Sequence, residues 1–113
     1  MRAVTTSLMA LTLAGCAVLG ARHVPATAPM RGLQVARTAC AQCHAVEPGG
    51  VSPQVRAPGF ASREMQHTAG LDGRVADLTR SGHYGMPPVP LSPGQVADVV
   101  AYIESLAQRD DGR

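Results

Sequence analysis

The feature that most constrains this chain is the segment Cys40-Ala41-Gln42-Cys43-His44. Two cysteines three positions apart lie on the same face of one helical turn. Their sulfur atoms can then bond to two vinyl groups along one edge of a porphyrin, and the imidazole that follows can reach the iron beneath the ring. This spacing is the sequence signature of covalent haem attachment. It predicts one haem c, bonded to Cys40 and Cys43, with His44 as the proximal iron ligand.

Three other interpretations of the two cysteines compete with haem attachment. A redox-active pair of the thioredoxin type usually begins a helix after a strand, whereas residues 33–39 are helical in composition. A zinc site at Cys40, Cys43 and His44 needs a fourth ligand, and the chain has no second cysteine pair. A disulfide between the two cysteines closes a tiny loop and stabilises little. Haem attachment is the interpretation that we favour.

The composition agrees with a large apolar group at the centre of the domain. The 113-residue chain has three aromatic side chains, Phe60, Tyr84 and Tyr102, and no tryptophan. A domain of this size buries a low fraction of its surface, and aromatic residues usually supply the largest blocks of buried area. A porphyrin would supply this buried apolar area in place of aromatic side chains. The net charge of +2 and the lack of any nucleic-acid motif exclude nucleic acid as a partner.

The first residues of the chain predict export. Residues 1–15 carry one positive charge at Arg2 followed by an apolar run, which is the layout of a signal peptide and is too short to span a bilayer. The run ends in Leu13-Ala14-Gly15-Cys16, which resembles a bacterial lipobox and implies a lipid anchor at Cys16. Residues 16–30 then form a tether on the periplasmic side of the membrane. Cleavage after Ala28 would instead release a soluble periplasmic protein.

The rest of the chain predicts an all-α domain over residues 31–108 and a disordered tail over 109–113. No segment alternates cleanly enough to be a strand. Helices are predicted over residues 31–46, over 73–81 after Asp72 as the capping residue, and over 92–106. The last helix has the clearest start, because Ser92 is an N-cap, Pro93 occupies the first helical position and Gln95 completes a capping box.

From Gly32 to Leu106 the chain resembles a small bacterial class I cytochrome c. That family has a small residue eight positions before the first motif cysteine, where Gly32 stands, so that the first and last helices can cross closely. Tyr102 matches the aromatic residue at this crossing, whereas Ala36 stands where many members carry phenylalanine. The resemblance implies a fold of three to four helices around one covalently bound haem.

The resemblance also implies that Met86 is the sixth iron ligand. Met86 lies in Gly85-Met86-Pro87-Pro88, in the loop before the last helix, where the prolines would hold the thioether in place. A methionine and histidine pair raises the haem potential. Three other side chains are rival donors, of which the last is the most serious: Met65, His67 and His83.

A proximal histidine usually donates its second ring N–H to a fixed acceptor. In class I cytochromes the acceptor is a proline carbonyl, and Ala57-Pro58-Gly59-Phe60 resembles that segment. The resemblance therefore assigns the acceptor to Pro58 and packing against the haem to Phe60, with Pro53 as the alternative acceptor.

A haem iron with both axial positions filled implies electron transfer rather than enzymatic chemistry. The predicted function is a single-electron carrier that exchanges electrons with other redox proteins, as a monomer or a loosely associated subunit. Docking should be weak and fast, and the low net charge predicts a modest dependence of the rate on salt. An unbound Met86 would indicate a gas sensor or a weak peroxidase instead. A fixed electron-entry subunit of a membrane oxidoreductase is the third alternative.

Overall fold

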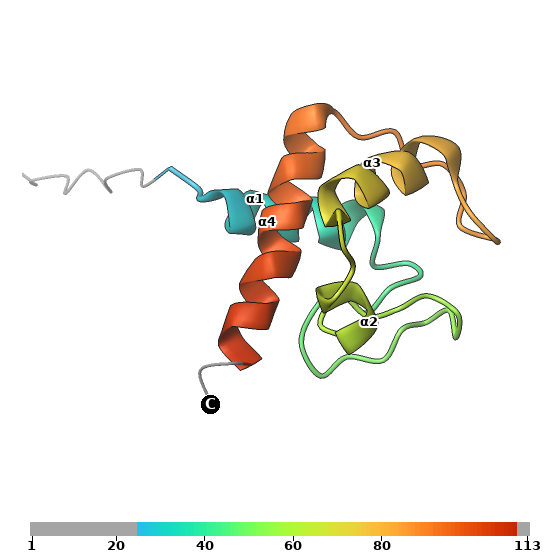
Figure 1. The fold of residues 1–113 in the computed structure, drawn as a ribbon, viewed down its shortest axis with the longest axis horizontal. Coiled ribbons are helices and arrows are strands. Elements are labelled where there is room, and N and C mark those ends of the chain that lie inside the picture. The colour runs from blue at the N-terminus through green and yellow to red at the C-terminus, as the bar shows by residue number, and fades with distance from the viewer. Residues whose placement is uncertain (1–24, 111–113) are drawn as a thin grey trace, which may run out of the picture.

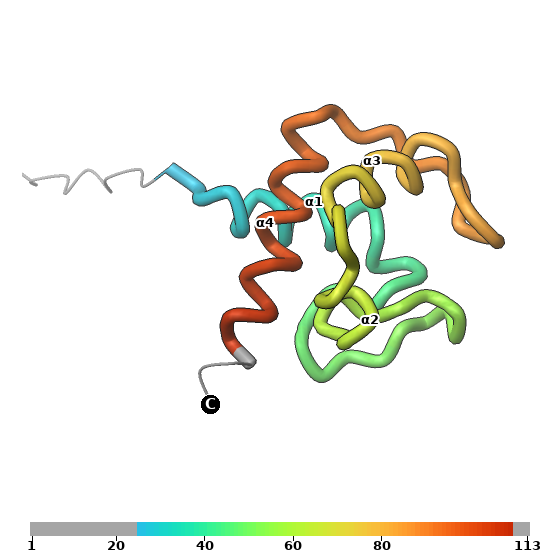
Figure 2. The backbone as a smooth tube through the Cα atoms, in the orientation of Figure 1, coloured from blue at the N-terminus to red at the C-terminus, as the bar shows by residue number. Residues whose placement is uncertain are grey.

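The structure is a computed structural model that describes residues 25–110 of the chain. It contains four helices: α1 at Ala28–Ala39, α2 at Arg63–Gln66, α3 at Leu71–Ser81 and α4 at Pro93–Asp110. The described residues form no strand, so the fold is all-α, as predicted. Figures 1 and 2 show α4 crossing α1, with α2, α3 and the long loops extending to the same side of α4.

The first and last helices cross at Gly32, which confirms the prediction for this residue. A Cβ atom added to Gly32 would lie 1.9 Å from the carbonyl oxygen of Asp98 and 2.8 Å from Cβ of Tyr102. Only a residue without a side chain allows α1 and α4 to approach this closely. Ala36, one turn further along α1, is completely buried, so its small side chain continues the close contact.

The hydrophobic core lies along the inner face of α4. Val99, Tyr102, Ile103 and Leu106 are each at least 97% buried and pack with residues of α1 and the following loops. The hydroxyl of Tyr102 donates a 2.7 Å hydrogen bond to the carbonyl of Val46. This bond satisfies a buried polar group and ties the loop after α1 to the last helix.

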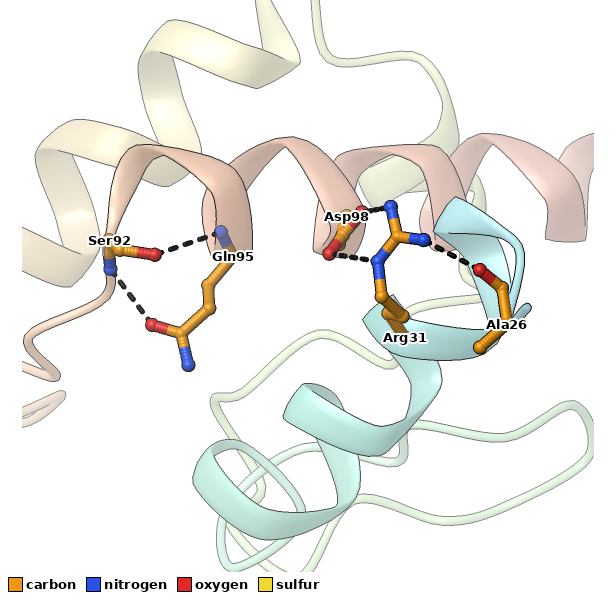
Figure 3. Close-up of polar contacts among 5 residues, drawn as sticks. All are labelled: Ala26, Arg31, Ser92, Gln95 and Asp98. Atoms are coloured by element: carbon orange, nitrogen blue, oxygen red, sulfur yellow. Dashed lines mark hydrogen bonds and ion pairs between the residues drawn. The ribbon is translucent and has the colours of Figure 1, made fainter. Parts of the chain in front are cut away.

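An ion pair on the surface holds the same crossing (Figure 3). The guanidinium of Arg31 binds the carboxylate of Asp98 with two hydrogen bonds of 2.8 Å and 2.6 Å, and its remaining nitrogen donates to the carbonyl of Ala26 at 2.6 Å. The hydrogen bond from Arg31 lowers the pKa of Asp98. One side chain therefore links the segment before α1 to both helices.

Helix α4 begins as the sequence predicts. The amide of Ser92 donates to the side-chain oxygen of Gln95 at 2.9 Å, and the amide of Gln95 donates to the hydroxyl of Ser92 at 3.2 Å (Figure 3). The capping box is thus confirmed. The helix continues to Asp110, beyond the apolar stripe that ends at Leu106, and therefore includes residues 109 and 110 of the predicted tail.

Helix α1 differs at both ends from the predicted 31–46. It begins at Ala28, because Pro29 in the first turn is pre-organised for helix, so residues 28–30 of the predicted tether are helical. It ends at Ala39, because the amide of Ala41 bonds to the carbonyl of Ala36, five residues back, and the regular i→i−4 pattern stops there. The cysteine motif consequently forms a separate turn.

The two short helices also differ from the prediction. Helix α3 begins at Leu71 after Gly70, two residues earlier than predicted, so Asp72 lies inside its first turn rather than at the cap. Helix α2 was not predicted, because four residues carry too little periodicity.

In residues 25–110, no helix is long and apolar enough to cross a membrane. The predicted signal peptide and the anchor at Cys16 lie outside the described residues.

Candidate functional site

A cavity of about 800 Å³ lies between α3, α4 and the loops. Side chains of the cysteine motif form one edge, and Met86 comes from the loop before α4. Val99 and Ile103 of α4 form its apolar floor, each 1% exposed. The cavity therefore has an apolar interior with sulfur and imidazole donors at its walls.

The motif forms a single tight turn at the end of α1. The carbonyl of Cys40 accepts hydrogen bonds from the amides of Cys43 and His44, at 3.1 Å and 2.9 Å. Cys40 and Cys43 form no disulfide with each other; both are partly buried and line the cavity together with His44. The turn thus presents three consecutive donor groups of the motif to the same space.

Burial raises the pKa of the Cys40 thiol to about 11, and the neighbouring Cys43 adds to the effect. The thiol therefore stays protonated at neutral pH. A redox-active Cys-x-x-Cys pair requires the opposite, a thiol pKa lowered by nearby positive charge or a helix N-terminus. The electrostatic environment of Cys40 argues against the thioredoxin-like alternative.

The ring of His44 is fixed by the loop that follows the motif. Its Nδ1 atom lies 2.8 Å from the carbonyl oxygen of Pro58. A carbonyl can only accept, so Nδ1 carries the proton and Nε2 is left with its lone pair. This is the tautomer that a histidine needs to bind a metal through Nε2. The structure shows no such bond to Pro53, the alternative acceptor.

Phe60 supports the same histidine from the side. It is 4% exposed, and its ring centre lies 5.6 Å from that of His44 at a tilt of 53°. The amide of Phe60 donates to the carbonyl of Ala45 at 2.8 Å, and the hydroxyl of Ser52 accepts from the amide of Ala45 at 2.9 Å. The loop is therefore tied by two hydrogen bonds to Ala45, the residue that follows the motif, which holds Phe60 beside the histidine ring.

Met86 is the last residue of a tight four-residue turn, residues 83–86, which an isolated β-bridge closes and which we call the hairpin. His83 and Met86 exchange two backbone hydrogen bonds of 3.0 Å and 2.7 Å. The two residues at the tip, Tyr84 and Gly85, have φ angles of +36° and +89°, the left-handed pair of a type I′ turn. The glycine at the second tip position is the signal that sequence reasoning missed.

The base of this hairpin is attached to the end of α3. Gly82 has a φ angle of +71°, and a Cβ atom there would lie 2.6 Å from the carbonyl oxygen of Met86. Beyond the hairpin, the amide of Val89 donates to the carbonyl of Thr79 at 2.7 Å. The backbone on both sides of Met86 is therefore held by contacts with the end of α3.

The rival donors lie in different places. Met65 and His83 both line the cavity; Met65 is half-buried against the core, whereas His83 is exposed. His67 is exposed and does not line the cavity. The structure thus brings Cys40, Cys43, His44 and Met86 to one cavity and leaves His67 outside it.

This donor set fits a haem. Two thiols, an imidazole with a free Nε2 and a thioether surround an apolar space, which are the groups that covalent attachment and axial ligation require. Sequence reasoning did not single out Arg56 and Arg74, which also line the cavity and offer guanidinium groups to the two carboxylates of a haem. Among residues 25–110, no three His, Cys, Asp or Glu side chains are grouped so that they could hold a metal ion by themselves.

Comparison with known proteins gives one match. The family model described as "Cytochrome C oxidase, cbb3-type, subunit III" matches residues 27–103, which is more than half of the chain. No curated protein and no solved structure matches. The matched segment includes the cysteine motif, the cavity and the crossing of α1 and α4.

Proposed function

The chain belongs to the cytochrome c oxidase, cbb3-type, subunit III family of c-type cytochromes, and from this premise we propose that it is a single-electron carrier with His44 and Met86 as axial ligands. Membership in the family implies a covalently bound haem c with its iron and a role in electron transfer. When bound, the haem supplies a reversible one-electron couple. The proposal assigns the thioether bonds to Cys40 and Cys43.

One observation carries the assignment of the ligands: one cavity is lined by the motif and by Met86. His44 is held by Pro58 in the tautomer that leaves Nε2 free. Met86 is held by a hairpin that two backbone hydrogen bonds with His83 close. Two donors held in this way would bind iron with little rearrangement when its charge changes, as fast electron transfer requires.

With both axial positions occupied, no coordination site is left for oxygen, nitrite or peroxide. The protein then acts as an electron-transfer protein rather than as an enzyme or a gas sensor. Its partners are other redox proteins, which it meets in weak and fast encounters.

A second candidate function is a fixed electron-entry subunit of a membrane oxidoreductase. The family description, which names a subunit of cytochrome c oxidase, favours it. Purification from membranes in mild detergent distinguishes the two functions, because a fixed subunit copurifies with its oxidase in constant ratio and a carrier does not.

The place of the protein in the cell is part of the proposal. The apolar run before Cys16 supports export and a lipid anchor on the periplasmic side of a bacterial membrane. Mass spectrometry of the protein purified from membranes tests this: we expect a mature N-terminus at Cys16 carrying acyl chains. An unmodified N-terminus further along the chain would contradict the anchor and support the soluble form.

The axial assignment is tested with two matched methionine variants of the haem-loaded protein. Met86→Ala should abolish the weak long-wavelength charge-transfer band of thioether-bound ferric haem and allow the ferrous protein to bind carbon monoxide. Met65→Ala changes the same residue type in the same cavity and should keep the band and exclude carbon monoxide.

The opposite pattern would assign the ligand to Met65. A wild-type protein that lacks the band and binds carbon monoxide would contradict both methionines and support the sensor or peroxidase alternative.

A further inference from the structure

Tyr84 is the one non-glycine residue with a positive φ angle in the described part of the chain. It occupies the first tip position of the hairpin that carries Met86, with a φ angle of +36°. Asparagine, aspartate and glycine are preferred there, because a larger side chain strains the left-handed backbone. A tyrosine at this position therefore needs an explanation other than backbone preference.

Packing within the domain does not supply this explanation. Tyr84 is 89% exposed, so its side chain buries almost no surface and gains almost no stabilisation from packing. Its one aromatic contact is the ring of His83, with centres 3.9 Å apart, and His83 is itself exposed. A large side chain is thus held in a strained conformation on the surface, and residues of this kind gather at functional sites.

The position of Tyr84 in the molecule indicates its function. Tyr84 lines the same cavity as Met86, two residues away, and is at the same time exposed to solvent. In Figure 1 the hairpin after α3 and the loop before α2 project to the same side of the molecule. Gln54 and Arg56 of that second loop line the cavity as well.

The charge around the mouth indicates the chemistry of a partner. Arg56 and Arg74 line the cavity, and the two carboxylates of a haem would neutralise their guanidinium groups. Glu64 is the remaining charged side chain on the lining. Among the exposed large apolar side chains of the described residues, Tyr84 is the one that lines this cavity, and its phenol carries no charge.

We propose that Tyr84 is the docking anchor by which this cytochrome contacts a redox protein that has an apolar, weakly charged face around its own electron acceptor. Tyrosine gives much contact area for few rotatable bonds, which suits a small interface. In the encounter one electron passes to the partner, so this protein is oxidised and the partner is reduced, and no bond is made or broken. The proposal rests on the electron-transfer function above.

The test uses the haem-loaded, reduced protein and two oxidants. The first is the terminal oxidase in detergent-solubilised respiratory membranes of the organism that encodes the chain. The second is hexacyanoferrate(III), which is too small to need a docking face. The rate of re-oxidation is followed through the haem absorbance for the wild type, Tyr84→Gly, Tyr84→Phe and Val51→Ser. Val51 is the matched control, because it is 90% exposed and does not line the cavity.

We expect Tyr84→Gly to lower the rate constant with the membranes by about tenfold. The Phe variant, which keeps the ring, and the control variant should stay within about threefold of the wild type. All four proteins should react with hexacyanoferrate(III) at rates within about twofold of one another. Tyr84→Gly should unfold at a temperature no lower than the wild type, because glycine relieves the strain at φ +36°.

Several outcomes would overturn the proposal. Equal rates with the membranes for Tyr84→Gly and the wild type would show that no partner contacts this side chain. Equal slowing with both oxidants, or a large loss of stability, would show that Tyr84 serves the haem or the fold. A dimer in light scattering that becomes a monomer in Tyr84→Gly would identify a second copy as the occupant.

A wild-type protein that reacts with hexacyanoferrate(III) and not with the membranes would remove the proposed partner while leaving the electron-transfer function intact. Failure to react with either oxidant would contradict the function itself.

Discussion

Replacement of Gly32 by alanine tests the crossing on which the fold is built. The new Cβ atom would lie 1.9 Å from the carbonyl oxygen of Asp98 and 2.5 Å from its carbonyl carbon, whereas ordinary contact begins at about 3.4 Å. Both obstructing atoms belong to the backbone of α4, so no side-chain rotation relieves the clash. The two helices must move apart along a contact that buries Ala36 and Val99 almost completely.

The expected loss of stability follows from this geometry. Overpacking costs about 3 kcal/mol where the backbone has to shift. Alanine returns about 1 kcal/mol through its higher helix propensity. The net loss is then about 2 kcal/mol, and in a domain of this size it lowers the unfolding temperature by about 8–16 °C.

The assay is thermal unfolding of the haem-loaded protein, followed by circular dichroism and by the haem absorbance. Gly73→Ala is the matched control, because Gly73 lies in α3 and an added Cβ atom would meet nothing within 4 Å. This variant should be as stable as the wild type or more stable by up to about 1 kcal/mol. If Gly32→Ala unfolds at the same temperature as Gly73→Ala, the reasoning about the close crossing is refuted.

Three further predictions concern other parts of the domain. The hydrogen bond from Arg31 lowers the pKa of Asp98 in the folded state. The bond therefore stabilises the folded protein above the unfolded pKa of about 3.9, and this stabilisation is lost as pH falls through the folded pKa. In an acid titration, Asp98→Asn should lose stability less steeply than the wild type below about pH 4. Ser92→Ala removes the hydroxyl that caps Gln95 and should cost about 1 kcal/mol in urea unfolding, and no change would mean that the capping box is not formed in solution. Phe60→Ala should cost about 3–5 kcal/mol in the same assay, because the ring is 4% exposed and supports the motif histidine; a cost below about 1 kcal/mol would contradict its place in the core.

Local signals in the sequence predicted the parts of the fold that depend on a few neighbouring residues. Ser92, Pro93 and Gln95 predict the start of α4, because the cap depends only on contacts among these neighbouring residues. Gly32 was expected at the helix crossing through resemblance to a family, and the structure places it there. The all-α class followed from the absence of alternating segments.

Features that depend on distant residues were missed or misplaced. The composition stays helical past Ala39, but the helix ends there, and the loop that follows is held by the bond from Tyr102 to Val46, 56 residues apart in the sequence. Helix α2 is four residues long, and the side chain of Gln66 within it donates to the carbonyl of Ile103 at 3.1 Å. Such contacts leave no periodic pattern in the sequence.

The candidate site was predictable in part for the same reason. The motif is local, so its three residues could be predicted from the sequence alone. The proposed sixth iron ligand, Met86, lies far from the motif in the sequence. Which methionine or histidine lies opposite His44 depends on the tertiary fold, which local sequence does not reveal. The sequence predicts only a loop around Met86 and not the tight turn, because tyrosine is an unusual residue for the left-handed backbone.

The central claim is that a single haem is bonded covalently to this chain at its two neighbouring cysteines. Intact-mass spectrometry of the denatured protein, produced with haem-attachment machinery and treated with an alkylating reagent, tests it most directly. We expect the mass of the mature polypeptide plus one haem, with Cys40 and Cys43 unmodified by the reagent. A colourless polypeptide with both cysteines alkylated would contradict the account.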